Sequence, residues 1–178
     1  MKIYYREKSG GIEILRCFGI EGRVEIPGMI DGKLVISAAP YAFSSHMDEK
    51  ENLKNASLWE VSDGLEFGRE EHVLAGNDVE EIVFPYTLKE IGRYIFYGCG
   101  NLKKLEFSDS LMQIGCGAFT GCHALEKLTV HMRQGKKSGV KEMLGEMWQR
   151  IDVNFLYEYE EARLVFPEHY DCLLYTSD

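Results

Sequence analysis

The residues best suited to chemistry lie in the middle of the chain and are Cys99, Cys116, Cys122 and His123. Zinc prefers thiolate and imidazole ligands, and structural sites usually take them as pairs with about two to four residues between them. No cysteine pair has that spacing here, so we predict no metal site. A cysteine nucleophile needs a histidine base beside it, and none of the five histidines shares a recognisable motif with a cysteine.

Other kinds of active site cannot be assembled either. The sequence holds no glycine-rich phosphate loop of the GxGxxG or GxxxxGK[ST] type. Carboxylate pairs carry little information among 29 acidic residues, most of which we expect at the solvated surface. We therefore predict no catalytic residues, no cofactor and a protein that is not an enzyme.

Composition limits the partners and the compartment. A net charge of −9 and a pI near 5.1 disfavour nucleic acid, because a phosphate backbone would be repelled. No apolar run approaches the ~20 residues of a membrane span, and no apolar stretch resembles a secretory signal. Five cysteines without framework spacing indicate reduced thiols. We expect a cytoplasmic protein, with the cell surface as the alternative.

A 23-residue period organises the middle of the chain. It relates Val79, Leu102 and Leu125, then Ile82, Leu105 and Leu128, then Phe84, Phe107 and Val130. The same offset relates Ile91 to Ile114, Gly92 to Gly115, Phe96 to Phe119, and Cys99 to Cys122. Alternating apolar residues are typical of a half-buried strand, and a fixed period is typical of a solenoid whose successive coils stack.

Each repeated slot then has a structural role. Gly92 and Gly115 are expected where the chain turns tightly and a side chain would clash. Phe96 and Phe119 are expected to fill the space between the two sides of a coil. Cys99 and Cys122 are expected to stack as small buried residues, one in each coil.

A diverged copy of the repeat occupies residues 23–46. Val24-x-Ile26-Pro27 matches Ile82-x-Phe84-Pro85, and His46 takes the cysteine slot. The unit Ile114-Gly-x-x-Ala118-Phe119-x-x-Cys122-x-x-Leu125-x-x-Leu128 resembles the BspA-type (treponemal) leucine-rich repeat. The resemblance covers residues 23–46 and 79–130. It implies a leucine-rich repeat solenoid that binds proteins or other surface ligands, as in bacterial surface proteins of this family.

The segments around the repeats complete the predicted fold, a β-rich α+β repeat solenoid with an N-terminal strand pair and a C-terminal capping helix and strand. We expect N-terminal strands and the degenerate repeat over 1–46, an acidic insertion over 47–78 and the clear repeats over 79–131. Residues 132–171 are expected to be a cap or the start of a further domain. Residues 172–178 resemble a translated sequencing adapter, which predicts a natural chain that continues past Asp171.

Local patterns predict further elements. We expect a short helix near 49–57 and a strand near 65–67 within the insertion. Val140, Met143, Leu144, Met147 and Ile151 follow the spacing of one apolar helix face, which predicts a helix over 138–150. Ser138 is its expected N-cap, and the face is expected to dock on the last coil. Alternation over 151–157 predicts a strand.

The outward side chains of the repeat strands are the candidate partner-binding face. They form three rows across the coils: Glu80, Lys103 and Glu126; Glu81, Lys104 and Lys127; Val83, Glu106 and Thr129. These rows can set register and solubility, or they can contact a partner. Few aromatic anchors lie on them; Tyr86, Tyr94, Tyr97 and Trp59 lie elsewhere. We predict a non-catalytic protein-interaction module. The alternatives are the scaffold part of a larger protein and a surface adhesin.

Overall fold

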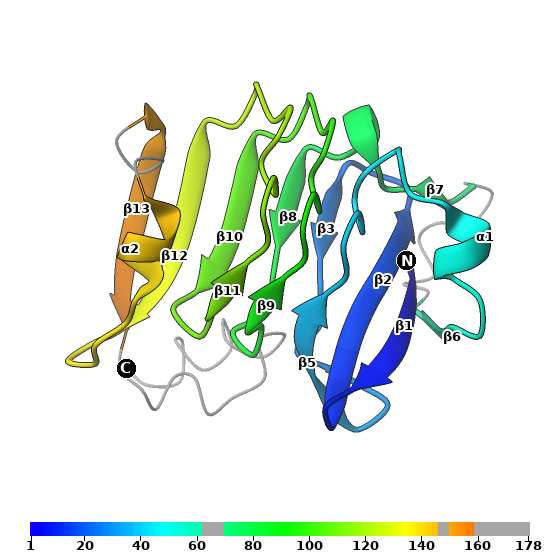
Figure 1. Ribbon diagram of the computed structural model, residues 1–178, viewed down its shortest axis with the longest axis horizontal. Helices are drawn as coiled ribbons and strands as arrows, with labels where there is room; N and C mark the ends of the chain where they lie inside the picture. The colour runs from blue at the N-terminus through cyan, green and yellow to red at the C-terminus, as the bar shows by residue number, and fades with distance from the viewer. Residues whose placement is uncertain (62–69, 146–149, 159–178) are drawn as a thin grey trace.

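The computed structural model describes residues 1–61, 70–145 and 150–158, and they form a solenoid with one sheet on each side (Figure 1). Sheet B is entirely parallel, and its strands follow chain order. They are β3 (Arg23–Glu25), β8 (Glu81–Val83), β10 (Lys104–Ser108), β12 (Lys127–Arg133) and β13 (Asp152–Glu158). The predicted repeat solenoid is confirmed.

Sheet A lies on the other side of the coils. Its parallel part is β2 (Gly11–Gly19), β5 (Lys33–Ala38), β9 (Glu90–Ile91) and β11 (Gln113–Ile114). The N-terminal strand β1 (Lys2–Lys8) pairs antiparallel with β2. Three short strands complete the sheet, namely β4 (Met29–Ile30) beside β5, β6 (Ser57–Glu60) beside β1, and β7 (His72–Val73) beside β2.

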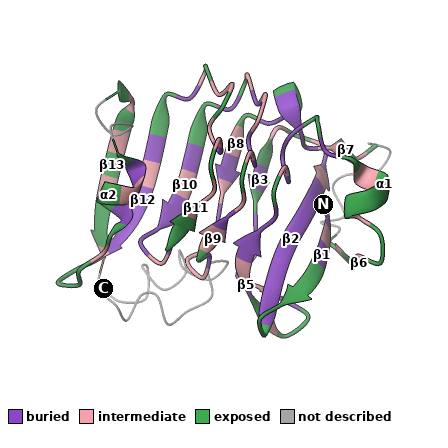
Figure 2. Ribbon diagram, in the orientation of Figure 1, coloured by how far each residue is buried: buried purple, intermediate pink, exposed green. Residues whose placement is uncertain are grey.

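Each coil runs through one strand of each sheet, and we number the coils 1 (residues 23–46), 2 (81–103) and 3 (104–126). Equivalent residues pair directly between coils 2 and 3, Leu105 opposite Ile82 and Ile114 opposite Ile91. Inward side chains therefore stack into continuous ladders that form one core along the solenoid. Figure 2 shows buried positions in the strands of both sheets. One ladder contains Val24, Ile82, Leu105, Leu128 and Val153.

The diverged copy is a true coil. Val24 pairs with Ile82 in sheet B, and Ala38 pairs with Ile91 in sheet A. Asp31 and Gly32 both have positive φ and link β4 to β5, as a tight two-residue hairpin turn requires. Coil 1 thus stacks directly on coil 2. Val24 and Ile82 are 58 residues apart in the chain, which is 35 more than the 23-residue period.

The insertion builds the N-terminal end of sheet A. Its helix α1 covers Glu49–Asn52, shorter than the predicted 49–57, because Leu53 ends it and Asn55 adopts a left-handed conformation. β6 follows and extends the sheet beyond β1, and β7 returns to β2 before a 3-10 turn over Gly76–Asp78. The strand predicted near 65–67 lies outside the described residues.

Arg16 fixes the N-terminal hairpin to coil 1. Its side chain is almost fully buried, and its guanidinium donates to the carbonyls of Tyr41, Ala42 and Ser44 and to Glu49 Oε1. The carbonyls equivalent to that of Ala42 accept a backbone N–H of the preceding coil: Ile95 accepts from Phe43, and Ala118 accepts from Phe96. Coil 1 has no preceding coil, so Arg16 satisfies its buried acceptors.

The C-terminal end differs from the prediction in two ways. Helix α2 covers only Val140–Leu144, because Gly145 ends it with positive φ, and its N-cap is Gly139 rather than Ser138. Ser138 lies one position before this N-cap, and its hydroxyl accepts a hydrogen bond from the N–H of Val140. The docking prediction is confirmed, since Val140 and Leu144 are buried in the common core. Residues 146–149 of the predicted helix lie outside the described part.

The predicted strand near 151–157 is confirmed as β13, but it continues sheet B. Val153 pairs with Leu128 and Phe155 with Val130, so the inward ladders extend one rung further. Among the described residues, sheet A gains no strand beyond β11 to match β12 or β13. In the chain, helix α2 takes that place between β12 and β13.

Two glycines permit the close stacking of coils. A Cβ on Gly92 would lie 2.4 Å from the Pro40 nitrogen, and one on Gly115 would lie 2.2 Å from the Arg93 nitrogen. Both contacts are with backbone, which cannot swing away. The predicted clash is confirmed, and its cause is the neighbouring coil.

We predict that Gly115→Ser lowers the free energy of unfolding by about 1–3 kcal/mol, the usual effect of forcing atoms into a packed region. The control is Gly139→Ser, where a Cβ meets no atom within 4 Å. Urea unfolding monitored by circular dichroism measures both variants. Equal losses in the two would contradict the role of coil stacking.

Candidate functional site

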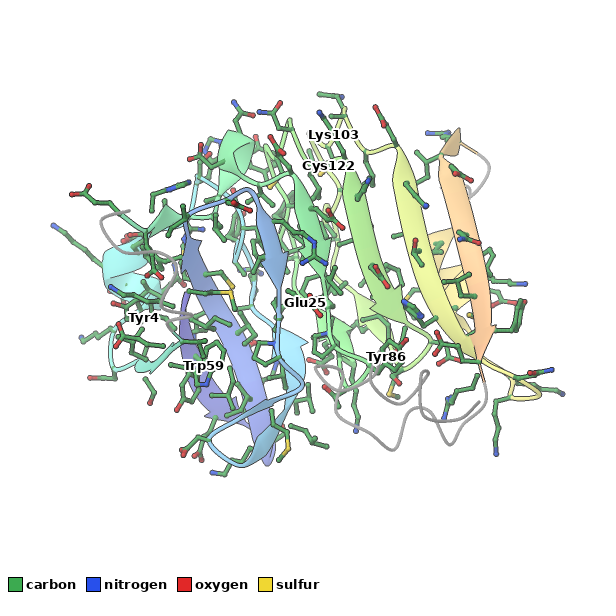
Figure 3. All side chains as sticks on the ribbon, turned by 180° about the vertical axis from the view of Figure 1, so that it is seen from behind. Tyr4, Glu25, Trp59, Tyr86, Lys103 and Cys122 are labelled. Atoms are coloured by element: carbon green, nitrogen blue, oxygen red, sulfur yellow. The ribbon has the colours of Figure 1, made fainter. Side chains whose placement is uncertain are left out.

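Six of the nine predicted residues lie on the outer face of sheet B, and Glu80, Lys103 and Glu126 immediately precede β8, β10 and β12. Lys104 lies opposite both Glu81 and Lys127, and Glu106 lies opposite Val83 and Thr129. Backbone hydrogen bonds from Lys103 to Glu80 and from Glu126 to Lys103 align the remaining row. Figure 3 shows this face, with side chains projecting from all five strands.

The edge strands β3 and β13 extend these rows beyond the predicted residues. Arg23 precedes Glu81 in one row and Asp152 follows Lys127, while Glu25 and Asn154 bracket the other row. Arg23 Nε lies 3.5 Å from Glu81 Oε1. Lys104 and Lys127 are exposed neighbours of like charge, so Lys103, Lys104 and Lys127 form a basic cluster in the middle of an acidic molecule.

A buried ionic cluster lies at the end of the same face. His131 of β12 is 7% exposed and contacts two carboxylates, Glu106 of β10 through Nε2 and Glu158 of β13 through Nδ1. The Tyr86 hydroxyl donates to Glu158 Oε1 over 3.0 Å and lies 2.8 Å from His131 Nδ1. Three strands are therefore joined through one imidazole.

The environment of His131 favours its charged form. Burial lowers the pKa of the imidazole, but hydrogen bonds and charge interactions with Glu106 and Glu158 outweigh burial and raise the pKa to about 9. The two carboxylates thus favour the imidazolium form of His131 at neutral pH. Sequence reasoning missed this cluster, because its members come from four strands or loops with no local motif.

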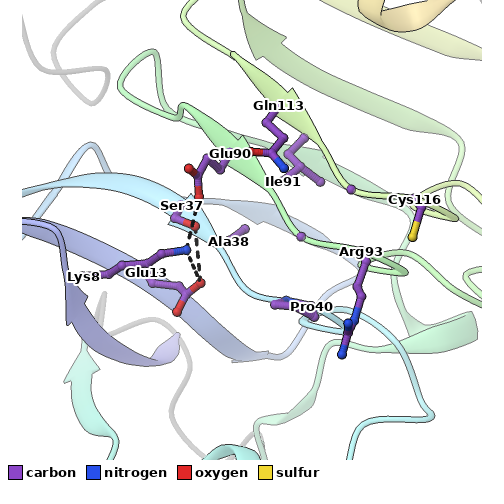
Figure 4. Close-up of a pocket in the computed structure, with 12 residues that line it drawn as sticks. Lys8, Glu13, Ser37, Ala38, Pro40, Glu90, Ile91, Arg93, Gln113 and Cys116 are labelled. Carbon is purple, nitrogen blue, oxygen red and sulfur yellow. Dashed lines mark hydrogen bonds and ion pairs between the residues drawn. The ribbon is translucent and has the colours of Figure 1, made fainter.

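A trough on the outer face of sheet A is the second polar feature (Figure 4). It has a volume of 360 Å³, and small residues such as Ser37, Gly92 and Gly115 line it. Glu13 is buried at its wall and pairs with Arg6 and Lys8, and Lys8 also reaches Glu90. These ion pairs neutralise one another, so the trough presents no single charge to a ligand.

The cysteine slot has a role that the sequence did not reveal. Cys99 Sγ donates to the Phe43 carbonyl, and Cys122 Sγ donates to the Phe96 carbonyl, each in the preceding coil. The four described cysteines are free thiols. Burial raises the pKa of Cys17, Cys99 and Cys122 to about 12. No group of three or more ligating side chains that could hold a metal occurs within residues 1–61, 70–145 and 150–158.

The four aromatic residues considered as anchors are engaged within the molecule. Tyr86 contacts His131, and Trp59 of β6 packs partly buried against the core. Tyr94 stacks on Tyr41 with ring centroids 5.6 Å apart, and its edge meets Tyr97. The ring of Tyr94 also lies over Gly117, the equivalent position of coil 3.

We predict that stability falls as the pH rises because His131 loses its proton. The imidazole has a higher pKa in the folded than in the unfolded chain, so its contribution is complete below about 6.5 and is lost as the pH passes about 9. The loss should be roughly 2–3 kcal/mol. Urea unfolding across this range measures it, and His131→Gln should flatten the dependence. A variant with an unchanged pH profile would contradict the assignment.

We also predict that iodoacetamide at pH 8 labels Cys116 well before Cys17, Cys99 or Cys122. Cys116 is exposed, whereas the other three thiols are shielded and have raised pKa values, and alkylation needs an accessible thiolate. Peptide mapping by mass spectrometry gives each rate. Labelling of Cys99 as fast as Cys116 would show that the thiol ladder opens in the native protein.

One family model and two solved structures were found to be similar to this chain. Residues 70–139 match the family model described as BspA type leucine rich repeat region (6 copies). A leucine-rich cell surface protein of Faecalibacterium prausnitzii A2-165 is 18% identical, with a TM-score of 0.46 over 73% of this chain and 31% of that chain. The leucine-rich repeat protein of T. pallidum is 22% identical, with a TM-score of 0.35 over 88% of this chain and 80% of that one.

The chain thus spans about a third of the F. prausnitzii structure. No curated protein matched it. Among the described helices, none has the length and apolar character needed to cross a membrane. The 23-residue period and the stacked parallel strands agree with the family match, so residues 70–139 are similar to the BspA-type leucine-rich repeat region.

Proposed function

We propose that the protein is a non-catalytic module that binds a protein partner through the outer face of sheet B. The observation that carries the proposal is the strand register, which aligns outward residues from the five strands of sheet B into rows. A rigid parallel sheet holds these rows in place without a cost of ordering on binding. Leucine-rich repeats generally serve as interaction folds.

The charges of the face indicate the chemistry of the partner. Lys103, Lys104 and Lys127 are exposed near its centre, while acidic side chains lie around them. A partner with an acidic patch flanked by basic residues would complement this pattern. Electrostatic complementarity of this kind contributes to specificity and to the rate of association.

We expect that reversing three central charges, Lys103→Glu, Lys104→Glu and Lys127→Glu, weakens partner binding at least tenfold. The matched control reverses Lys50, Lys54 and Lys137, which are exposed outside the face. Partners captured from source cells by the wild-type protein are purified, and their affinities for the three proteins are measured by calorimetry. The proposal fails if every captured protein binds the face variant and the control equally well.

Location and the absence of catalysis belong to the same proposal. We place the module in the cytoplasm, and cell fractionation tests this. Recovery of the native protein outside intact cells would favour the adhesin alternative. Sequencing the natural gene past the codon for Asp171 tests the scaffold alternative, because that role needs a further domain. The adapter-like residues 172–178 lie outside the described part of the chain.

A further inference from the structure

The last coil presents a row of backbone donors that no described residue satisfies. Tyr94, Phe96 and Gly98 of coil 2 donate their N–H groups to the carbonyls of Cys116, Ala118 and Thr120 in coil 3. Coil 1 follows the same rule, because the N–H of Phe43 donates to the carbonyl of Ile95 in coil 2. The equivalent donors of coil 3 are Gly117, Phe119 and Gly121, and none of them bonds a carbonyl within the described ranges.

Two of these donors, Gly117 and Phe119, line a groove together with Ala118 and Thr120. Met143 and Leu144 of α2 line its other side, with the apolar Ile151 and the charged Arg150. The groove has a volume of 750 Å³. It exists because sheet B continues to β13 whereas sheet A stops at β11, so α2 covers the end of the core without adding a rung.

Two inward side chains of coil 3 are more exposed than the equivalent side chains of coil 2, because no further coil covers them among the described residues. Phe43 and Phe96 are fully buried, and Phe96 lies 6.1 Å from Phe43 and 5.6 Å from Phe119 between ring centroids. Phe119 and Cys122, at the end of the same ladders, are only half-buried. The groove thus offers an apolar slot for a large side chain beside Phe119.

The opposite end of the solenoid shows what closure looks like. There, Arg16 donates to the carbonyls of Ala42 and Ser44, which would otherwise lack a coil to accept from. Buried backbone groups nearly always find partners, and the two ends of the solenoid differ in this respect. At the coil 1 end, the Arg16 side chain caps the backbone carbonyls. At the coil 3 end, the N–H groups of Gly117, Phe119 and Gly121 have no acceptor among the described residues.

We propose that this groove binds an extended peptide segment of a partner protein by backbone addition. Alternate carbonyls of the peptide would accept the N–H groups of Gly117, Phe119 and Gly121, and an apolar side chain would pack against Phe119. Strand addition of this type draws affinity from the backbone and specificity from the side-chain pocket. The groove is distinct from the outer face of sheet B, so the two proposals can fail separately.

The probe is a synthetic peptide that copies residues 113–122 with both cysteines replaced by serine. This segment already lies on coil 2 with its carbonyls toward the donors of that coil. We expect saturable binding by fluorescence polarisation, and slower amide hydrogen exchange at Gly117, Phe119 and Gly121. A scrambled peptide should not bind.

The variant Thr120→Arg places a long charged side chain in the groove at an exposed position, and we expect it to weaken peptide binding at least tenfold. Met112→Arg is the matched control, because Met112 is 74% exposed and does not line the groove. The triple lysine variant of sheet B should bind the peptide normally. Melting curves establish that each variant is folded.

Three results would overturn the proposal. The first is no saturable binding up to millimolar peptide, or equal binding of the scrambled peptide. The second is binding that leaves the exchange of the three amides unchanged. The third is a wild-type dimer in solution that Thr120→Arg makes monomeric, because the occupant would then be a second copy of this chain.

Discussion

The backbone of each coil lies one strand spacing, ~4.8 Å, from the next, and this distance constrains every repeated residue. It leaves no room for a Cβ at Gly92 or Gly115, where the neighbouring backbone is already in contact. It also brings the Cys99 thiol within hydrogen-bond reach of the Phe43 carbonyl. A residue type therefore recurs where contacts with the adjacent coil limit the size or the hydrogen bonding of the side chain.

The same constraint explains which parts of the fold could be predicted. Slots such as Ile82, Leu105 and Leu128 repeat because they stack, so the period alone indicated the coils and their register. The insertion and the C-terminal segment have no period to read. The lengths of α1 and α2 depend on the conformations of Asn55 and Gly145, which tertiary context selects.

The candidate functional features also differ in whether the repeat predicts them. The rows of sheet B follow from the repeat, and their alignment was visible in the sequence. The His131 cluster was not, since Glu106, Glu158 and Tyr86 meet His131 only after three strands and a loop have assembled. Arg16 is a similar case: its three carbonyl acceptors lie 25 to 28 residues away, in a turn whose position depends on coil 1. Buried polar groups of this kind lock separate elements together, and single-residue patterns do not reveal them.

The capping of coil 1 by Arg16 also bears on how copies of this protein can associate. A solenoid with free donors at one end and free acceptors at the other could join head to tail, and such contacts do not close on themselves, so they produce fibres. Here the carbonyls of Ala42 and Ser44 are already occupied, and the strands β1 and β6 cover that end of sheet A. On the sheet A side, copies of the chain therefore lack one of the two complementary ends that head-to-tail stacking needs, which disfavours open-ended polymerisation through that sheet.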